Sequence, residues 1–155
     1  MPLSLEHFKL LNAKANSFDR GTGGVPDITF QEVADALATV EYPVSVYARF
    51  LYARQRELWP QVIDLMIKEI AKEIDPIEDI HKQIAELAVT ALIDPLIHGS
   101  LTHAQKAFAV GIPWWTRKNE NLYRKALSLL DEWDFELRVA IKKWNEGHPI
   151  WLTNP

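Results

Sequence analysis

The amino-acid sequence predicts an all-α protein, and three observations support this prediction. Apolar residues recur every three or four positions along most of the 155 residues, as they do on the buried face of a helix. No stretch alternates apolar and polar residues over the length of a convincing strand. Capping residues and prolines stand where the helical patterns begin. We therefore expect a compact helical domain around a hydrophobic core.

Capping residues mark where the first two helices are expected to begin. Ser4 is placed to cap a short helix, and a glycine-rich connector is predicted for residues 19–26. Thr29 and Glu32 have the spacing of a capping box, in which each side chain satisfies a free amide of the first turn. A second helix is therefore expected to begin after Thr29.

The middle of the chain shows three further boundaries. Pro43 suits the first turn of a helix that is predicted to reach about Leu58, and Trp59-Pro60 interrupts the pattern. A new helix is expected at Asp75-Pro76, with the aspartate as cap and the proline at the first helical position. Pro95 and His98-Gly99 are expected to end it.

The last third is predicted to hold two helices and a turn. A short helix starts at Ser100 or Thr102 and stops at Gly111, and a second helix starts near Pro113 and runs to about Asn145, closed by Gly147. We divide the chain into an acidic helical part over residues 1–99, this two-helix segment over residues 100–147, and a tail over residues 148–155.

Composition limits the classes of function. The chain has no cysteine, which excludes disulfides, zinc ribbons and thiol nucleophiles and fits a reducing compartment. No apolar run is long enough to span a bilayer, and the N-terminus lacks the basic start of a signal peptide. A cytoplasmic protein without a membrane segment is the expectation.

The charge is unevenly distributed. The net charge is −4, yet residues 101–155 hold eight lysines and arginines against six aspartates and glutamates. Within residues 101–130 there are five bases and a single acid, Glu120. A local positive field in an otherwise acidic protein favours a confined contact with nucleic acid over a coating of the whole surface.

Catalytic and metal-binding patterns are weak. Glu78 and His81 have a spacing used in di-iron helix bundles, but no second copy occurs, so we interpret the pair as a solvated helix face. No serine lies in a nucleophile elbow, and the glycines of residues 21–24 lack the lysine of a phosphate loop. The sequence predicts no enzyme, no metal and no cofactor.

The two-helix segment partly satisfies the requirements of a DNA-reading helix-turn-helix. Ala107 is the small residue four positions before the turn glycine, Gly111, and Val110 and Ile112 are the apolar flanks. Lys106 and Arg117, in contrast, occupy positions that are usually apolar.

The predicted second helix would present its first turns to the major groove. Arg117 suits guanine edges or phosphates, and three further bases suit phosphates. At least one of the two adjacent tryptophans is expected to be buried, since neighbouring helical residues point about 100° apart. The predicted DNA-binding residues are Trp114, Trp115, Thr116, Arg117, Lys118, Arg124 and Lys125.

Several runs resemble bacteriophage Q-type late antitermination proteins, over about half of the chain. In the C-terminal third the matching residues are the run Leu101-Thr102-His103-Ala104-Gln105-Lys106-Ala107-Phe108-Ala109-Val110-Gly111-Ile112, then Trp115, Tyr123, Leu130-Asp131-Glu132-Trp133 and Leu137. In the N-terminal part they are Thr29-Phe30-Gln31-Glu32-Val33-Ala34-Asp35-Ala36-Leu37 and Tyr47-Ala48-Arg49-Phe50-Leu51-Tyr52-Ala53. Several members of that family carry a cysteine-rich zinc insertion before the helix-turn-helix, which this chain lacks.

The resemblance implies a prophage-type transcription regulator that binds double-stranded DNA and engages host RNA polymerase in antitermination. The acidic N-terminal part would then contact protein, and a homodimer would suit a palindromic site. A second hypothesis is a helical protein-interaction module, a scaffold or an inhibitor of a host protein, without DNA binding. Its support is the net negative charge, the incomplete helix-turn-helix and the tryptophans Trp144 and Trp151. An enzyme ranks third.

Overall fold

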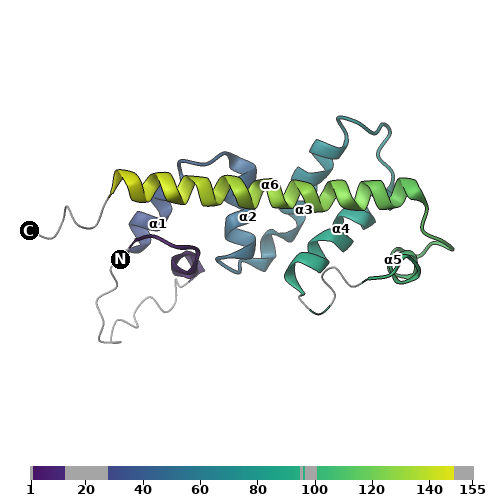
Figure 1. Ribbon diagram of the computed structural model, residues 1–155, viewed down its shortest axis with the longest axis horizontal. Coiled ribbons are helices and arrows are strands. Elements are labelled where there is room, and N and C mark those ends of the chain that lie inside the picture. The colour runs from purple at the N-terminus through teal and green to yellow at the C-terminus, as the bar shows by residue number, and fades with distance from the viewer. Residues whose placement is uncertain (1, 13–27, 95, 97–100, 149–155) are drawn as a thin grey trace, which may run out of the picture. The chain divides into compact units, whose positions relative to one another are not determined.

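The computed structural model describes residues 2–12, 28–94, 96 and 101–148, and these residues form helices and no strands. The prediction of an all-α protein is therefore confirmed. In chain order the elements are η1 (Leu5–Asn12), α1 (Phe30–Leu37), α2 (Tyr42–Leu51), η3 (Arg56–Leu58), α3 (Trp59–Ile70), α4 (Asp79–Ile93), α5 (His103–Val110) and α6 (Arg117–Gly147) (Figure 1). None of the helices in the described residues combines the length and the apolar character needed to cross a membrane.

The chain divides into two compact units. We call Met1–Trp59 together with Trp133–Pro155 the terminal unit, and Pro60–Glu132 the inserted unit. The long helix α6 contributes residues to both of them. The composition boundary between residues 99 and 100 stays a prediction.

The terminal unit packs η1, α1 and α2 with the second half of α6. Tyr47 of α2 lies against Trp133 of α6, with ring centroids 6.2 Å apart, and Phe8 of η1 meets Tyr52 edge to face at 6.5 Å. The amide of Leu3 donates to Asn145 Oδ1 at 2.9 Å, and Asn145 Nδ2 donates back to the carbonyl of Leu3 at 2.9 Å. The N-terminal segment is thus fixed to the last turns of α6.

The inserted unit has its own apolar core. The buried residues come from the inner faces of α3, α4 and the first half of α6, at the helical spacing that the sequence predicts. They include Val62, Ile63, Met66, Ile70, Ile84, Ala85, Ala88, Leu122, Ala126 and Leu130.

Two predicted boundaries in the middle of the chain are wrong. The helix that begins at Tyr42-Pro43 ends at Leu51 rather than near Leu58, because the backbone turns into the left-handed region at Arg54, with a φ of 57°. The Arg56 guanidinium donates to the carbonyls of Phe50 and Leu51, which the end of the helix leaves free. The helix expected from Asp75-Pro76 begins at Asp79 instead.

The beginning of α4 explains the metal-like pair. The backbone amide of Glu78, the residue before the helix, donates to Nδ1 of His81 at 2.8 Å. Glu78 and His81 therefore cap the helix, and one ring nitrogen of the histidine is already used. Among the residues that the structure describes, no three His, Asp or Glu side chains lie together as a metal site would need.

Some predictions fall on residues whose structure is not described. They are the connector over residues 19–26, the helix end at Pro95 and His98-Gly99, the start at Ser100, and Trp151 in the tail. These predictions lie outside the described residues.

Candidate nucleic-acid interface

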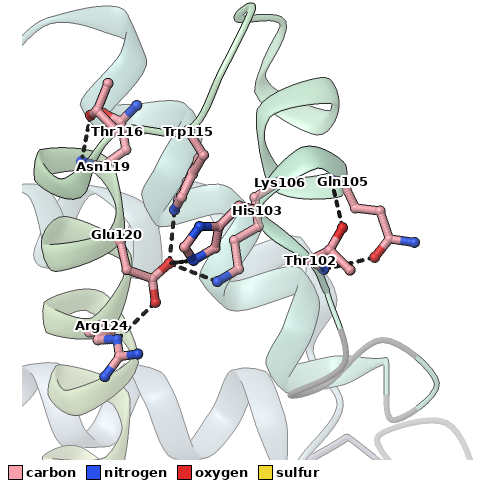
Figure 2. Close-up of polar contacts among 9 residues, drawn as sticks. All are labelled: Thr102, His103, Gln105, Lys106, Trp115, Thr116, Asn119, Glu120 and Arg124. Atoms are coloured by element: carbon pink, nitrogen blue, oxygen red, sulfur yellow. Dashed lines mark hydrogen bonds and ion pairs between the residues drawn. The ribbon is translucent and has the colours of Figure 1, made fainter.

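The segment predicted to read DNA lies in the inserted unit, and we call residues 102–125 the α5–α6 corner. Its first helix is confirmed, since α5 begins after Thr102 and ends before Gly111. The Thr102 hydroxyl accepts from the amide of Gln105 at 3.1 Å, and the Gln105 side chain accepts from the amide of Thr102 at 2.8 Å (Figure 2). This reciprocal pair satisfies two amides that the first turn leaves free.

Gly111 ends α5 in the left-handed conformation. Its φ of 77° and ψ of 32° are open to glycine without the steric cost that other residues pay. The amide of Gly111 donates to the carbonyl of Phe108 at 3.1 Å, and that of Ile112 donates to Ala107 at 3.0 Å. The last carbonyls of α5 are thereby satisfied, and the chain leaves the helix in a fixed direction.

The second helix begins later than predicted. The expected start near Pro113 is wrong, because α6 begins at Arg117. The hydroxyl of Thr116 accepts from the amide of Asn119 at 3.2 Å, which makes Thr116 the cap. Residues 112–116 form a connector longer than the three- to four-residue turn of a standard helix-turn-helix. Trp114 and Trp115 therefore precede the helix instead of lying in its first turn.

Glu120 is the polar centre of the corner, as Figure 2 shows. Its Oε1 accepts from Lys106 Nζ and from Trp115 Nε1, both at 2.8 Å. Its Oε2 accepts from Arg124 Nε at 2.8 Å. His103 Nε2 lies 3.7 Å from Oε1. One carboxylate of α6 therefore holds α5, the connector and the next turn of its own helix.

Lys106 is buried, with 7% of its surface exposed, although it occupies a position that is usually apolar. Its ammonium pairs with Glu120 and lies 4.5 Å from the ring centroid of Tyr123 and 5.7 Å from that of Trp115. These two rings pack edge to face at 6.1 Å. Aromatic faces and a carboxylate together offset the cost of removing the charge from water.

The protonation of Glu120 is set by its partners. Burial by itself would raise the pKa of this carboxyl, but the hydrogen bonds from Lys106, Arg124 and Trp115 outweigh it and lower the pKa to about 2. Glu120 is therefore ionised throughout the neutral range, where it balances the charge of Lys106.

The two adjacent tryptophans have different environments. Trp115 is buried and bonded to Glu120, whereas Trp114 has 72% of its surface exposed. The prediction that at least one of the pair is buried is confirmed. Sequence reasoning did not anticipate the part that Glu120 plays, although its four-residue spacing from Arg124 is a common ion-pair signal on a helix.

The four predicted basic residues differ in whether an acid already pairs with them. Residues 117 and 124, like residues 118 and 125, lie seven positions apart and so fall on nearly the same side of α6. Arg117 and Lys118 are exposed and form no ion pair within the described part of the chain. Arg124 is exposed but pairs with Glu120, and the half-buried Lys125 pairs with Glu73. Of the four predicted bases, Arg117 and Lys118 are therefore the two that no acid pairs with among the described residues.

A groove of about 790 Å³ runs beside these bases within the inserted unit. Thr116 and Lys118 at the start of α6 line it together with Lys125, and so do Glu73, Asp75 and Glu78 from the segment between α3 and α4. These acids would repel phosphates, and Arg117 is not among the lining residues.

The terminal unit holds a second polar cluster, which sequence reasoning missed. Asp134 Oδ1 accepts from Tyr47 Oη at 2.8 Å and from Tyr52 Oη at 2.5 Å, and Oδ2 accepts from Arg138 Nε at 2.6 Å. Burial and the hydrogen bond to Asp134 raise the pKa of Tyr52 to about 12. The carboxylate accepts hydrogen bonds on both oxygens, so the cluster joins α2 to α6.

Comparison of the chain with models of protein families, with curated proteins and with solved structures found no match.

Proposed function

We propose that the protein is a DNA-binding transcription regulator of the prophage type, similar to Q-type late antitermination proteins. The observation that supports the proposal is the exposed pair Arg117 and Lys118, which lacks acidic partners among the described residues and begins α6 at a firmly held corner. Double-stranded DNA is the ligand that this arrangement suits, since phosphates supply the opposite charge and exposed arginines also pair with guanine.

The corner is organised before any ligand arrives. Thr116 fixes where α6 begins, and Glu120 holds α5 through Lys106 and the connector through Trp115. Arg117 and Lys118 therefore project from a support that these hydrogen bonds hold together. A contact whose support is ordered in advance loses less conformational entropy on binding.

Arg124 and Lys125 contribute less to DNA binding in this proposal than the sequence predicts. Arg124 is exposed enough to exchange Glu120 for a phosphate, but Lys125 would have to leave Glu73 in its half-buried position. We assign the main phosphate contacts to residues 117 and 118. The contact of the acidic N-terminal part with host RNA polymerase follows from the family resemblance and belongs to the same proposal.

The test is binding to mixed genomic DNA fragments over a series of salt concentrations, with Arg117→Ala/Lys118→Ala beside the wild type. The matched control is Lys142→Ala/Lys143→Ala, which removes two exposed bases from the other end of α6. We expect salt-sensitive binding by the wild type and the control. The 117/118 variant should bind more weakly, with a slope of log K against log salt reduced by about two, roughly one for each lost phosphate contact.

Absence of binding at low salt would contradict the proposal. Equal losses in both double variants would also contradict it, because they would show attraction to any positive charge rather than to this corner.

A protein-interaction module is the second candidate, and two observations favour it. Arg124 and Lys125 are paired with acids, and Phe108 on α5 has 87% of its surface exposed. If the wild type fails to bind DNA, a pull-down with wild type and Phe108→Ala tests this alternative. Recovery of one host protein by the wild type and its loss with the variant is the expected result.

A further inference from the structure

Trp114 is the most unusual side chain of the α5–α6 corner. Tryptophan buries more apolar surface than any other residue and is highly buried on average in folded proteins. Here 72% of its surface remains exposed, while Trp115 beside it is buried. An exposed indole therefore stands three positions before Arg117 and four before Lys118, and both of these exposed bases lack an acidic partner among the described residues.

The backbone that carries Trp114 is fixed at both ends. On one side, Gly111 and Ile112 donate to carbonyls of α5. On the other side, the indole of Trp115 donates to Glu120 and Thr116 caps α6 (Figure 2). The ring of Trp114 is therefore presented to solvent from a connector of which both flanks are tied to helices.

A flat exposed ring beside cations suits DNA with an unpaired base better than a fully paired duplex. In a fully paired duplex the ring faces of the bases are covered by their neighbours, and only edges and phosphates are open. An unpaired base exposes its π-face, and stacking on an aromatic side chain tolerates every base. Cations beside such a ring hold the phosphates that flank the unpaired base.

We propose that Trp114 stacks on an unpaired base, so that the α5–α6 corner binds DNA with a short unpaired segment more tightly than fully paired DNA. The inference rests on the proposed function and deepens it, since Arg117 and Lys118 would hold the same strand by its phosphates. Trp115 takes no part in stacking, because its ring is buried against Tyr123.

The experiment compares two labelled DNAs of the same length and mixed sequence. One is a paired duplex, and the other carries a central bubble of several mismatched pairs. The proteins are wild type, Trp114→Ala, Trp114→Phe and Phe108→Ala, the last a matched loss of an exposed aromatic ring from α5. Thermal unfolding of each variant establishes that it is folded, as expected for exposed positions.

We expect the wild type to bind the bubble more tightly than the duplex. Trp114→Ala should weaken bubble binding by about 5- to 150-fold, the range that base stacking gives on alanine substitution, and should change duplex binding little. Trp114→Phe should keep part of the preference, and Phe108→Ala should keep all of it.

The outcomes separate this inference from the proposed function. If neither DNA binds at low salt, both fail. If the duplex binds through Arg117 and Lys118 but the wild type shows no preference for the bubble, the inference alone fails. It also fails if Trp114→Ala weakens both DNAs equally, since the ring would then contact a feature that paired DNA shares.

Discussion

Glu120 places a negative charge among three nitrogen donors, and each donor depends on it to a different degree. Arg124 is exposed and would return to water if the carboxylate were removed. Lys106 is buried, so its ammonium would be left without a counter-ion in a poorly hydrated place. The loss of one partner from a buried pair costs more than the loss of both, because the remaining charge is uncompensated.

We therefore predict that Glu120→Gln destabilises the protein by about 2–4 kcal/mol, with Lys106 as the cause. The double variant Lys106→Met/Glu120→Gln should recover most of the loss, since an apolar chain of similar length replaces the buried charge. Urea unfolding of the wild type, the single variant and the double variant measures both effects. An equal loss in the single and the double variant would contradict the explanation.

The same residue makes stability depend on pH. The pKa of Glu120 is about 2 in the folded protein and about 4.5 in the unfolded chain, so the unfolded chain takes up the proton first as the pH falls. The stabilisation is complete above about pH 4.5 and is lost between that value and pH 2. The difference in stability between wild type and Glu120→Gln should therefore shrink over this window, and it should stay constant between pH 6 and 7.

At the scale of the element, the end of α5 depends on the backbone of one residue. Gly111 has a φ of 77°, and a Cβ built there would meet nothing within 4 Å. Any cost of a side chain at this position comes from the left-handed backbone and not from a clash. Gly147, at the end of α6, has equally open space and no positive φ.

We predict that Gly111→Ala lowers the free energy of unfolding by about 1–2 kcal/mol, the cost of the left-handed conformation for a residue with a Cβ. Gly147→Ala is the matched control and should be neutral or slightly stabilising, since alanine favours the helix. Chemical unfolding of the two variants side by side checks the prediction. A similar change in both would mean that the backbone of Gly111 is not the cause.

Elements with local start and stop signals could be predicted from the sequence. Thr29 caps α1, and Thr102 and Gly111 bound α5, because each acts on backbone groups within a few residues. Where two local signals competed, the prediction failed. Asp75-Pro76 suits a helix start, but Glu78 and His81 form the cap of α4. Pro113 likewise suits the first turn, but Thr116 caps α6.

The candidate site was predictable in composition and not in arrangement. Its residues could be chosen from the local excess of bases around Glu120. Which of those bases stay available depends on contacts between elements, such as that of Lys125 with Glu73, 52 positions away in the chain. The burial of Trp115 rather than Trp114 also depends on Glu120. Spacing on a single helix carries no information on such partners.

At the scale of the whole molecule, α6 offers a matched pair of core leucines. Leu137 lies in the terminal unit and Leu130 in the inserted unit, and each is about 1% exposed. Each loses packing when shortened to alanine, at a typical cost of about 2–5 kcal/mol.

If the two units unfold separately, the two variants should lose protection against amide hydrogen exchange in different helices. We predict that Leu137→Ala speeds amide hydrogen exchange mainly in α1 and α2, and that Leu130→Ala does so mainly in α3 and α4. Mass spectrometry of peptides from the exchanged protein resolves the two regions. Faster exchange throughout the chain in both variants would mean that the protein opens as one cooperative unit.

The division of the chain also sets an order of events during synthesis, which runs from the N-terminus. The residues of Pro60–Glu132 are consecutive, so the inserted unit has all its parts as soon as Glu132 has left the ribosome. The helices α1 and α2 are synthesised earlier, but their contacts with α6 form only after Trp133 and Asp134 have been added. Trp133 packs against the ring of Tyr47, and Asp134 accepts a hydrogen bond from its hydroxyl. The helices α1 and α2 are therefore synthesised before the residues of α6 that cover them. A chain that stops short of α6 leaves the apolar side chains of these two helices, and that of Tyr47, exposed to solvent.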